Sequence, residues 1–425
     1  MKAVILAAGE GIRLRPLTLT RPKHLIAIGG RPILEHILDS LKVAGLNEAL
    51  IIAHYMADKL QQFFDNGSRF GIELKYKLQD GVRGTADAAG LARSYVDEDF
   101  LLIYGDLVVT PDIVKKVIGS HEEEKPDVTM AVAPVDNPEH YGIVKLKGHH
   151  VADIIEKPSP EVAPTNLANA GIYVLSPKIF EKIEQTPPSK RKEQEITDSL
   201  RLLIQEKKSV LAVRIPREEW LDIGRPWDLL EANRQILSRV EPMVKGEIED
   251  GTHLIGPVAV AKDARIRSGA YIEGPIFIDR NSDIGPNCYI RPYTSIGKNV
   301  RIGNGCEIKN SIIMDKTHIG HLSYVGDSVI GEDCNLGAGT TVANFRLDSK
   351  SVRMIIKDKV VDSERRKLGV ILGDSVKTGI NTLFMPGVKV GHNSQIGPNL
   401  VISRDVPSNA FLLLKQEIEE REIRD

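Results

Sequence analysis

The sequence predicts an α/β protein in which an N-terminal Rossmann-like domain with a mostly parallel sheet precedes a C-terminal left-handed parallel β-helix. Two observations support this fold class. In the first half of the chain short apolar segments alternate with amphipathic ones, and strands that alternate with helices favour a parallel sheet covered on both faces. In the second half an aliphatic residue recurs every six positions, which is the repeat of a parallel β-helix.

Composition is that of an ordinary globular protein with two or three domains. The chain has 425 residues, 42% hydrophobic and 27% charged, and its formal net charge of -2 argues against nucleic acid or an anionic membrane as a partner. The apolar start at 3–8 is too short for a signal peptide, and no apolar run reaches the roughly 20 residues of a membrane span. Three cysteines are too few for a disulfide framework. We therefore expect a soluble cytoplasmic protein.

The first half of the chain divides into strands and helices. Short apolar runs predict strands at 2–8, 48–53, 100–104, 128–135 and 172–175. Apolar residues at helical spacing predict helices at 33–44, 56–66 and 111–124. The segment 141–156, which contains a Gly-His-His turn at 148–150, is expected to form an antiparallel excursion from the sheet.

A helical linker at about 226–238 leads into the six-residue repeat. Its first run contains nine aliphatic residues in succession, Val260, Ile266, Ile272, Ile278, Ile284, Ile290, Ile296, Ile302 and Ile308. The spacing resumes at Ile313, Ile319, Val325, Ile330, Leu336 and Val342, and finally at Leu372, Thr378, Phe384, Val390, Ile396 and Ile402. Each is expected to point inward and to stack on the residue one coil later. Cys288 and Cys306, which are one coil apart, are expected to stack inside as well.

The repeat is interrupted once, at 343–370, by a segment rich in basic residues. We expect an external loop there, which is either a binding loop or a solvated basic surface. The charged tail at 417–425 is expected to be a surface helix or disordered. The predicted domains are therefore 1–225, a linker at 226–242, the β-helix at 243–410 with its inserted loop, and a tail at 411–425.

A glycine-rich loop follows the first predicted strand. Gly9 and Gly11 let the backbone approach phosphate groups and offer N–H groups to them, and Arg13 can add charge-assisted hydrogen bonds. The loop is not a dinucleotide fingerprint, because Leu14 occupies the place of the third glycine, and no Gly-Lys-Ser/Thr follows to make it a P-loop. Taken alone, it leaves a nucleotide ligand as one possibility among several.

Five motifs in order carry a family resemblance. The loop continues as Gly9-x-Gly11-x-Arg13-Leu14-x-Pro16-Leu17-Thr18 and then Arg21-Pro22-Lys23. The other motifs are Tyr104-Gly105-Asp106, Glu156-Lys157-Pro158, Asn169-Ala170-Gly171-Ile172-Tyr173 and Trp220-Leu221-Asp222-Ile223-Gly224. Together they resemble the signature of the sugar-nucleotide pyrophosphorylases, which are sugar-1-phosphate nucleotidylyltransferases, over nearly all of residues 1–235.

The chemistry of such an enzyme accounts for these residue types. A sugar phosphate is already an anion and needs no general base to attack a nucleoside triphosphate, so catalysis consists of positioning and charge neutralisation. Mg²⁺ prefers oxygen ligands and retains waters, so one or two aspartates suffice. Asp106 and Asp222 each follow an apolar run, where ligands gather in open α/β sheets, although a single Asp there is more typical of a turn. Within the full motif set they are the candidate metal ligands.

The resemblance implies the other roles in this domain. Arg13 and Lys23 would hold the triphosphate and stabilise the transferring phosphoryl group. The side-chain amide of Gln79 would read the edge of uracil or thymine, so UTP or dTTP is the expected nucleotide. The implied nucleotide-binding residues are Leu6, Ala8, Gly9, Gly11, Gln79, Gly84 and Thr85. The implied sugar-phosphate contacts are Gly142, Glu156, Lys157 and Asn169.

A second resemblance lies in the β-helix, which can be either a scaffold or an acyltransferase. The segments at 320–327 (GHLSYVGD) and 335–339 (NLGAG) resemble the acetyltransferase half of the bacterial bifunctional enzyme that acetylates glucosamine 1-phosphate and then uridylylates the product. An amine loses a proton as it attacks the thioester of acetyl-CoA, so His321 is the candidate base. The implied amino-sugar phosphate contacts are Arg291, Lys309, Tyr324, Asn335, Asn344 and Lys350. The implied acetyl-CoA contacts are Ala338, Ile380 and Lys415.

Departures from the bacterial pattern resemble archaeal bifunctional enzymes. Asp222 stands where the bacterial enzyme typically has Asn, and Ile380 stands where a small polar residue is usual. The leading hypothesis is a bifunctional enzyme that uses Mg²⁺ and acetyl-CoA and forms a homotrimer, or a higher oligomer, through the β-helix. One alternative is a long-form glucose-1-phosphate thymidylyltransferase with a purely structural β-helix. Another is an inert regulatory subunit resembling those of the translation-initiation exchange factor.

Overall fold

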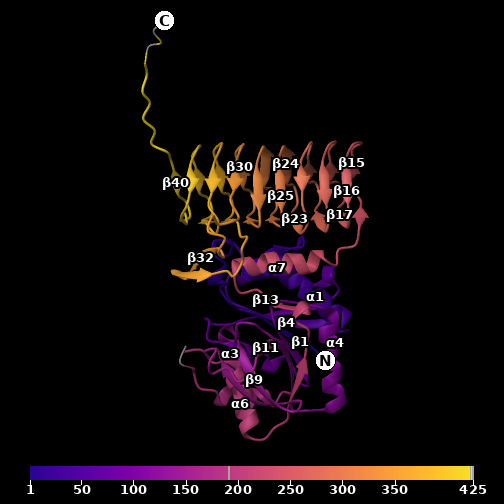
Figure 1. Cartoon of the computed structure of the whole chain (residues 1–425). Coiled ribbons are helices and arrows are strands. Elements are labelled where there is room, and N and C mark those ends of the chain that lie inside the picture. Colours follow the sequence, from indigo (N-terminus) through magenta and orange to yellow (C-terminus); the bar gives the residue numbers. More distant parts are fainter. Residues whose placement is uncertain (190–191, 422, 424–425) are drawn as a thin grey trace. The chain divides into compact units, whose positions relative to one another are not determined.

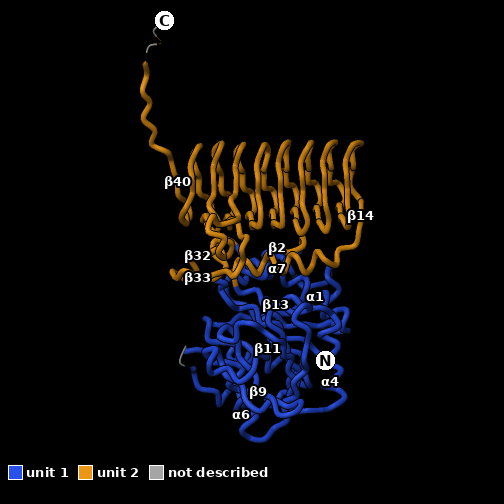
Figure 2. Tube along the Cα trace, viewed as in Figure 1, with its two compact units in different colours: residues 1–11, 21–26, 31–224 blue, residues 12–20, 27–30, 225–425 orange. Residues whose placement is uncertain are grey.

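The computed structural model describes residues 1–189, 192–421 and 423. The chain divides into two compact units (Figure 2). The first unit consists of 1–11, 21–26 and 31–224, and the second of 12–20, 27–30 and 225–425. Two short pieces of the N-terminal sequence therefore group with the C-terminal half of the chain. No helix among the described residues has both the length and the apolar character needed to cross a membrane.

The first unit is built around a nine-stranded mixed sheet (Figure 1). In spatial order its strands are β5 (Glu73–Leu78), β4 (Glu48–Ala53), β1 (Ala3–Ala7), β6 (Phe100–Tyr104), β11 (Leu167–Leu175), β8 (Val128–Pro134), β12 (Val210–Arg214), β10 (His150–Glu156) and β9 (Gly142–Lys147). The first four of these are mutually parallel, whereas β11 runs antiparallel to both β6 and β8. All five predicted strands are present. The antiparallel direction of β11 could not be predicted, because an alternation of strands and helices favours parallel strands only.

Strand β1 explains why the apolar start of the chain lies at the centre of the sheet. All five of its residues are buried. Ala3, Ile5 and Ala7 pack in one hydrophobic core, while Val4 and Leu6 pack in another on the opposite face. Successive side chains of a strand point to opposite faces, so a strand covered on both sides is apolar without interruption.

Helices supply the other side of each core. They are α1 (Ile33–Val43), α2 (Ala57–Phe64), α3 (Thr85–Gly90), α4 (Pro111–Glu124), α5 (Ile179–Gln185) and α6 (Ile196–Gln205). Helix α4 has the predicted bounds, since a proline is tolerated at the first helical position, where its missing N–H would have no partner. Helices α1 and α2 end one and two residues before their predicted ends. In α1 the cause is Gly45, whose φ of 86° follows the C-cap residue Ala44.

Short elements complete this part of the chain. The 3-10 helices are η1 (Ile12–Leu14), η2 (Leu17–Leu19), η3 (Lys23–Leu25), η4 (Ser68–Phe70), η5 (Leu91–Ser94), η6 (Pro138–His140) and η7 (Arg217–Glu219). The remaining strands are β2 (Ala27–Ile28), β3 (Arg31–Pro32), β7 (Leu107–Val109) and β13 (Trp220–Asp222). The predicted antiparallel excursion at 141–156 is confirmed, because β9 and β10 pair in antiparallel register with His150 opposite Lys147.

The second unit is a parallel β-helix with three sheets. The first sheet consists of β14 (Met243–Val244), β17 (Val258–Val260), β20 (Ile276–Ile278), β23 (Thr294–Ile296), β26 (Ile312–Ile313), β29 (Val329–Ile330), β34 (Ile371–Leu372) and β37 (Lys389–Val390). The second consists of β15 (Glu247–Ile248), β18 (Arg265–Ile266), β21 (Asp283–Ile284), β24 (Arg301–Asn304), β27 (His318–His321), β30 (Asn335–Leu336), β35 (Lys377–Thr378), β38 (Gln395–Ile396) and β40 (Phe411–Leu412). The third consists of β16 (His253–Ile255), β19 (Tyr271–Glu273), β22 (Tyr289–Ile290), β25 (Glu307–Lys309), β28 (Tyr324–Gly326), β31 (Thr341–Val342), β36 (Leu383–Phe384) and β39 (Val401–Ile402).

The six-residue repeat gives this unit its core. All nine aliphatic residues of the first run are 0% exposed. Ile266 pairs with Ile284 and Ile284 with Ile302, so a coil has 18 residues, whereas Ile296 pairs with Ile313 and the coils become one residue shorter. The predicted inward stacking is thereby confirmed. All three cysteines are free and buried in this core, and burial raises the pKa of Cys288 to about 12.

The insertion at 343–370 contains an antiparallel hairpin of β32 (Arg353–Ile356) and β33 (Lys359–Asp362). The coil then resumes, and Ile330 pairs with Leu372 across the inserted residues. Beyond β40 the described residues form neither helix nor strand. A surface helix, one of the two expectations for the tail, is therefore wrong for those residues.

Helix α7 (Pro226–Leu237) is the predicted linker helix, one residue shorter than expected, and it groups with the second unit. The carboxylate of Asp228 accepts a hydrogen bond from the backbone N–H of Arg225 at 2.7 Å and caps the helix start. The fully buried Asn233 accepts from the Gly29 N–H at 2.7 Å and donates to the Tyr293 carbonyl at 2.9 Å. One buried amide therefore ties the helix to the β-helix coils and to 27–30.

Candidate active sites

A pocket of about 180 Å³ opens in the first unit where the strands β1, β5 and β6 end. Its lining residues are Leu6, Ala8, Gly9, Lys23, Gln79, Val82, Gly84, Thr85, Ala88, Tyr104, Asp106 and Glu193. Eight of these twelve are residues that the sequence assigned to nucleotide, catalysis or metal. Four different segments of the chain supply those eight, so the sheet topology brings them together. Gly11 does not line the pocket, and Arg13 lies exposed in η1, which groups with the second unit.

Lys23 and Asp106 form an ion pair at this pocket. Lys23 begins η3 and Asp106 follows β6, and their side chains are 14% and 15% exposed. Gly105 makes the approach possible, because a Cβ there would lie 2.9 Å from the Leu6 carbonyl oxygen and 3.0 Å from the His24 ring. The pocket therefore holds a partly desolvated positive charge beside a partly desolvated negative one.

His24 lies directly behind this pair. Its side chain is 0% exposed, and neither ring nitrogen has a hydrogen-bond partner among the described residues. Burial, reinforced by the positive charge of Lys23, lowers the pKa of His24 to about 3. His24 is therefore neutral at physiological pH, and the sequence did not identify it as part of the site.

The candidate metal ligands Asp106 and Asp222 lie on paired segments. Strand β13 pairs antiparallel with β7, so that Asp222 lies opposite Leu107, the neighbour of Asp106. The backbone N–H of Ile223 donates to the Asp106 carbonyl at 3.0 Å. Two carboxylates thus come from one small sheet beside the pocket, and a pair of hard oxygen donors fits Mg²⁺, which completes its shell with waters and phosphate oxygens. No group of three or more potential ligand residues occurs in the described part of the chain.

The predicted sugar-phosphate residues meet where β9, β10 and β11 come together. Gly142 pairs with Glu156 across β9 and β10, and Ala168, the neighbour of Asn169, pairs with Ile143. Lys157 has a positive φ of 48°, and its ammonium lies 3.4 Å from a Glu156 carboxylate oxygen. Three of the four residues are therefore joined by strand register, and the fourth by an ion pair.

Tyr104 connects the predicted sugar-phosphate residues with the pocket that contains Lys23 and Asp106. It lines the pocket, and its hydroxyl lies 3.3 Å from the hydroxyl of Tyr173 on β11. Burial raises the pKa of Tyr104 well above its usual value of 10, so the hydroxyl stays protonated. Sequence reasoning missed Tyr104 as a site residue, although it begins the motif that contains Asp106.

In the second unit three of the residues predicted for acetyl transfer, Lys309, Tyr324 and Asn344, lie around a buried carboxylate. Asp327 is 5% exposed and accepts hydrogen bonds from the side-chain amides of Asn344 at 2.5 Å and Asn310 at 2.7 Å. The ammonium of Lys309 lies 3.5 Å from the same carboxylate. Asn344 also donates to the Tyr324 hydroxyl at 3.1 Å. Asp327 was not among the predicted residues, although it ends the motif that contains His321.

Strand register explains this cluster. Lys309 pairs with Gly326, the residue before Asp327, and the Arg291 backbone N–H donates to the Ile308 carbonyl at 2.8 Å. Arg291 is thereby stacked beside Lys309, and its guanidinium donates to Glu307 at 2.9 Å. Spacing of one coil therefore places Arg291, Lys309 and Asp327 on successive coils of one sheet.

The other predicted residues of this site lie outside the cluster. Within the described residues, His321, Asn335 and Lys350 make no hydrogen bond or ion pair with the cluster residues. His321 ends β27 and is exposed, Asn335 begins β30, and Lys350 lies in the insertion. Ala338 is half-buried, Ile380 is 55% exposed, and Lys415 lies beyond β40. A single chain thus brings Lys309, Tyr324 and Asn344 together at Asp327, whereas the candidate base His321 lies apart from them at the end of β27.

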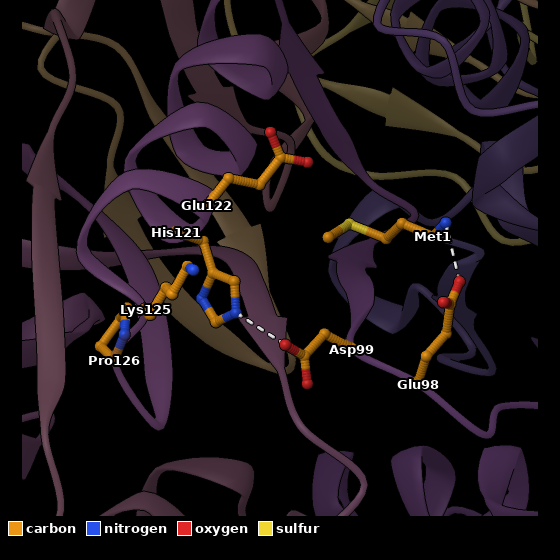
Figure 3. Close-up of a pocket in the computed structure, with 7 residues that line it drawn as sticks. All are labelled: Met1, Glu98, Asp99, His121, Glu122, Lys125 and Pro126. Atoms are coloured by element: carbon orange, nitrogen blue, oxygen red, sulfur yellow. Dashed lines mark hydrogen bonds and ion pairs between the residues drawn. The ribbon is translucent and has the colours of Figure 1, made fainter.

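Another pocket in the first unit, of about 540 Å³, contains none of the predicted residues (Figure 3). His121 lies 3.1 Å from Asp99 through Nε2 and 2.9 Å from the Thr129 hydroxyl through Nδ1. The N-terminal amine pairs with Glu98 at 2.8 Å. Both ring nitrogens of His121 and the N-terminal amine already have partners, so we assign this pocket no catalytic role.

Known proteins resemble this chain over both units. The nucleotidyl transferase family model matches residues 2–239, and that of the GMPPB C-terminal domain matches residues 272–384. Among solved structures, one described as a glucose-1-phosphate thymidylyltransferase from Bacillus anthracis in complex with a sucrose aligns with a TM-score of 0.51 and 30% identity, over 58% of this chain and 98% of that chain. A UDP-glucose pyrophosphorylase complexed with UDP-glucose aligns with a TM-score of 0.51 and 25% identity, over 56% of this chain and 98% of that chain.

Full-length relatives are bifunctional. The bifunctional protein GlmU of Methanocaldococcus jannaschii is 44% identical over 425 residues, which is 100% of both chains. The bifunctional sugar-1-phosphate nucleotidylyltransferase/acetyltransferase of Sulfurisphaera tokodaii is 41% identical over 416 residues, 97% of this chain and 99% of that one. This full-length identity supports the bifunctional hypothesis over the scaffold and regulatory alternatives. The chain belongs to the nucleotidyl transferase family and, with both of its units, to the group of bifunctional sugar-1-phosphate nucleotidylyltransferase/acetyltransferases.

Proposed function

We propose that the enzyme acetylates glucosamine 1-phosphate with acetyl-CoA in the β-helix, at 243–410, and transfers a uridylyl or thymidylyl group to the sugar 1-phosphate in the domain at 1–225. The observation that carries the first-unit assignment is the convergence of Lys23, Gln79 and Asp106 in one pocket. The presence of Lys309, Tyr324 and Asn344 around one carboxylate supports the second.

Nucleotidyl transfer needs positive charge at the triphosphate. Lys23, with Arg13, would bind the phosphate oxygens and stabilise the charge that develops on the transferring group. Asp106 and Asp222 would hold Mg²⁺, which supplies further charge neutralisation when bound. The sugar 1-phosphate would lie over Gly142, Glu156 and Asn169 with Lys157 at its phosphate. Tyr104 would separate the sugar from the base.

Acetyl transfer needs a base for the amine and cations for the sugar phosphate. His321 would take the proton that the amine loses as its nitrogen attacks the thioester carbonyl, and the thiol of coenzyme A would leave. Arg291, Lys309 and Lys350 would bind the phosphate. Asn344 already donates its amide N–H groups to Asp327 and Tyr324, so its oxygen would accept from the amine.

We further propose a cytoplasmic homotrimer formed through the β-helix. Three free cysteines suit a reducing compartment. Leu383 and Val401 stack in register on β36 and β39 and are 42% and 57% exposed, which gives a partner subunit an apolar surface to cover. Ala338, Ile380 and Lys415 would contact acetyl-CoA on that side of the coil.

The test is release of free thiol from acetyl-CoA with glucosamine 1-phosphate, measured for the wild type and for His321→Ala. We expect a loss of about 10²- to 10⁴-fold in the variant. Pyrophosphate release from UTP with N-acetylglucosamine 1-phosphate should stay unchanged in the same variant. Absence of thiol release from the wild type with every amino-sugar 1-phosphate would reduce the β-helix to a scaffold.

A further inference from the structure

Gln79 is held in one orientation of its side-chain amide by a residue that does not line the pocket. We propose that Asp87 is a positioning residue that turns the Gln79 oxygen toward the pocket, and that it thereby restricts the base of the nucleoside triphosphate to one with a hydrogen on N3, uracil or thymine, and excludes cytosine. The inference rests on the proposed nucleotide pocket and adds the origin of its base selectivity.

The backbone of Gln79 is fixed on both sides. It follows β5, its N–H donates to the Ala53 carbonyl at 2.9 Å, and its own carbonyl lies 2.9 Å from Nδ1 of His54. The side chain is only 3% exposed and lies among the pocket residues. Movement of the side chain is therefore limited to rotation of the amide about its last bond.

Two acceptors determine that rotation. The Gln79 amide nitrogen donates to a carboxylate oxygen of Asp87 at 2.7 Å and to the Gly84 carbonyl at 3.3 Å. An ionised carboxylate and a carbonyl can only accept hydrogen bonds. Rotating the amide by half a turn would bring the Gln79 oxygen against both acceptors and leave two repulsive contacts in place of two hydrogen bonds.

The Gly84 carbonyl is itself fixed. The backbone of Gln194 donates to the Arg83 carbonyl at 2.8 Å and accepts from the Ala86 N–H at 2.8 Å. Gly84 lies between these bonds with a φ of 112°, and a Cβ at this position would lie 2.3 Å from the Gln194 carbonyl oxygen. Only glycine fits here, and the Gly84 carbonyl also accepts from the Ala88 N–H at 3.2 Å, so this second acceptor is held in place.

The amide oxygen of Gln79 is left for a ligand. Within the described residues it has no hydrogen-bond partner, and it is not among their fully enclosed, unpartnered atoms. Because the residue is otherwise buried, the pocket is where this oxygen meets solvent. A fixed acceptor in a pocket selects a donor on the ligand.

The fixed Gln79 oxygen distinguishes bases by whether their N3 carries a hydrogen. Uracil and thymine carry a hydrogen on N3 that can be donated to the Gln79 oxygen, whereas N3 of cytosine carries a lone pair. Cytosine would therefore place two acceptors face to face, and sites built to pair with a donor strongly reject analogues that lack it. Asp87 acts through Gln79 and makes no contact with the base.

Equilibrium binding of UTP and CTP to the full chain, without sugar phosphate, tests this inference. We expect wild-type protein to bind UTP at least about 100-fold more tightly than CTP. Asp87→Asn keeps the shape of the side chain, but an amide can either donate or accept a hydrogen bond. The ratio of the affinities for UTP and CTP should therefore fall by about 10-fold or more, because UTP binds more weakly and CTP more tightly. Asp80→Asn is the matched control, because Asp80 is a fully exposed carboxylate next to Gln79, and its ratio should equal that of the wild type.

If Asp87 had a purely structural role, its substitution would lower the affinities for UTP and CTP by the same factor. A constant ratio in Asp87→Asn therefore overturns the inference, as does a wild-type protein that binds both nucleotides equally. UTP methylated at N3 should bind the wild type as poorly as CTP. The measurement needs no turnover, so failure of the proposed transfer reaction would appear as normal binding without pyrophosphate release and remain distinguishable.

Discussion

The two units of this protein place their functional side chains by different rules. In the first unit Lys23, Gln79 and Asp106 are far apart in sequence; Gln79 and Asp106 follow β5 and β6 of one sheet, and η3 brings Lys23 to them. In the second unit Lys309 and Asp327 meet because they are one coil apart and strand register stacks them. Positions of the second kind can be counted along a sequence, whereas positions of the first kind depend on the strand order. Changes in one unit should therefore leave the chemistry of the other intact.

A substitution at Lys23 tests this independence from the side of the first unit, and it should have the largest effect of the four comparisons that follow. Lys23→Met removes a cation from the pocket and with it the ion pair to Asp106. Loss of a group that stabilises charge in the transition state costs about 10²- to 10³-fold in rate. Pyrophosphate release should fall by this factor while thiol release from acetyl-CoA stays constant. Lys75→Met, at an exposed lysine, is the control. A parallel fall of both activities would contradict two separate rules of assembly.

Asp327→Asn tests the same independence from the side of the second unit. The variant keeps the shape but loses the charge that holds Lys309, Asn310 and Asn344. A hydrogen bond to a charged group is worth roughly 1.5–3 kcal/mol, so acetyl transfer should fall by about 10- to 100-fold. Asp333→Asn, at an exposed aspartate six residues further along the chain, should have little effect. Full acetyltransferase activity in Asp327→Asn would show that the cluster is not organised by this carboxylate.

A pH experiment sharpens the comparison, because the first unit contains an unpartnered buried histidine. The folded pKa of His24 is about 3, well below the ordinary histidine pKa of 6.5. Its neutral form therefore contributes stability that is complete above pH 6.5 and is lost as the pH falls toward 3. Between pH 6.5 and pH 5 the free energy of unfolding should fall by roughly 1.5–2 kcal/mol.

His24→Leu should remove this pH dependence. Urea unfolding at pH 6.5 and at pH 5 gives the difference in the free energy of unfolding between these two pH values. A change in stability from repacking is the same at both pH values and therefore cancels. His149→Leu, at an exposed histidine, should keep the wild-type dependence. An unchanged pH dependence in His24→Leu would mean that other groups cause the loss of stability.

The smallest effects are expected for two substitutions in the second unit, one in the six-residue repeat and one in its insertion. Ile284 is fully buried between Ile266 and Ile302, so Ile284→Val should cost about 0.5–1.5 kcal/mol in the free energy of unfolding. Ile355 on the inserted hairpin is 42% exposed, and Ile355→Val should change stability by less than about 0.5 kcal/mol. Thermal denaturation monitored by circular dichroism compares the midpoints of the two variants with that of the wild type. Equal shifts of the midpoint in both variants would contradict the division into core and insertion.

Local sequence signals were sufficient for most of the fold. The strands at 48–53 and 100–104 and the helix at 111–124 have their predicted bounds, because apolar runs and helical spacing report burial directly. The reversal at β11 has no such signal, since an antiparallel neighbour needs the same apolar residues as a parallel one. A surface helix in the tail is wrong for its described residues, because these charged, exposed residues have no apolar face to bury.

The sequence by itself determined the period of the β-helix, the identity of the family and the residues of its motifs, because these properties depend on spacing along the chain. Only the tertiary structure decided that Tyr104 and Glu193 line the predicted nucleotide pocket, that His24 is neutral, that Asp87 lies against the Gln79 amide, and that Asn344 of the inserted segment donates to Asp327. Each of these depends on a distance or a degree of burial between segments separated along the chain. Hydrogen-bond direction and desolvation act through space, so they follow from the fold and not from sequence spacing.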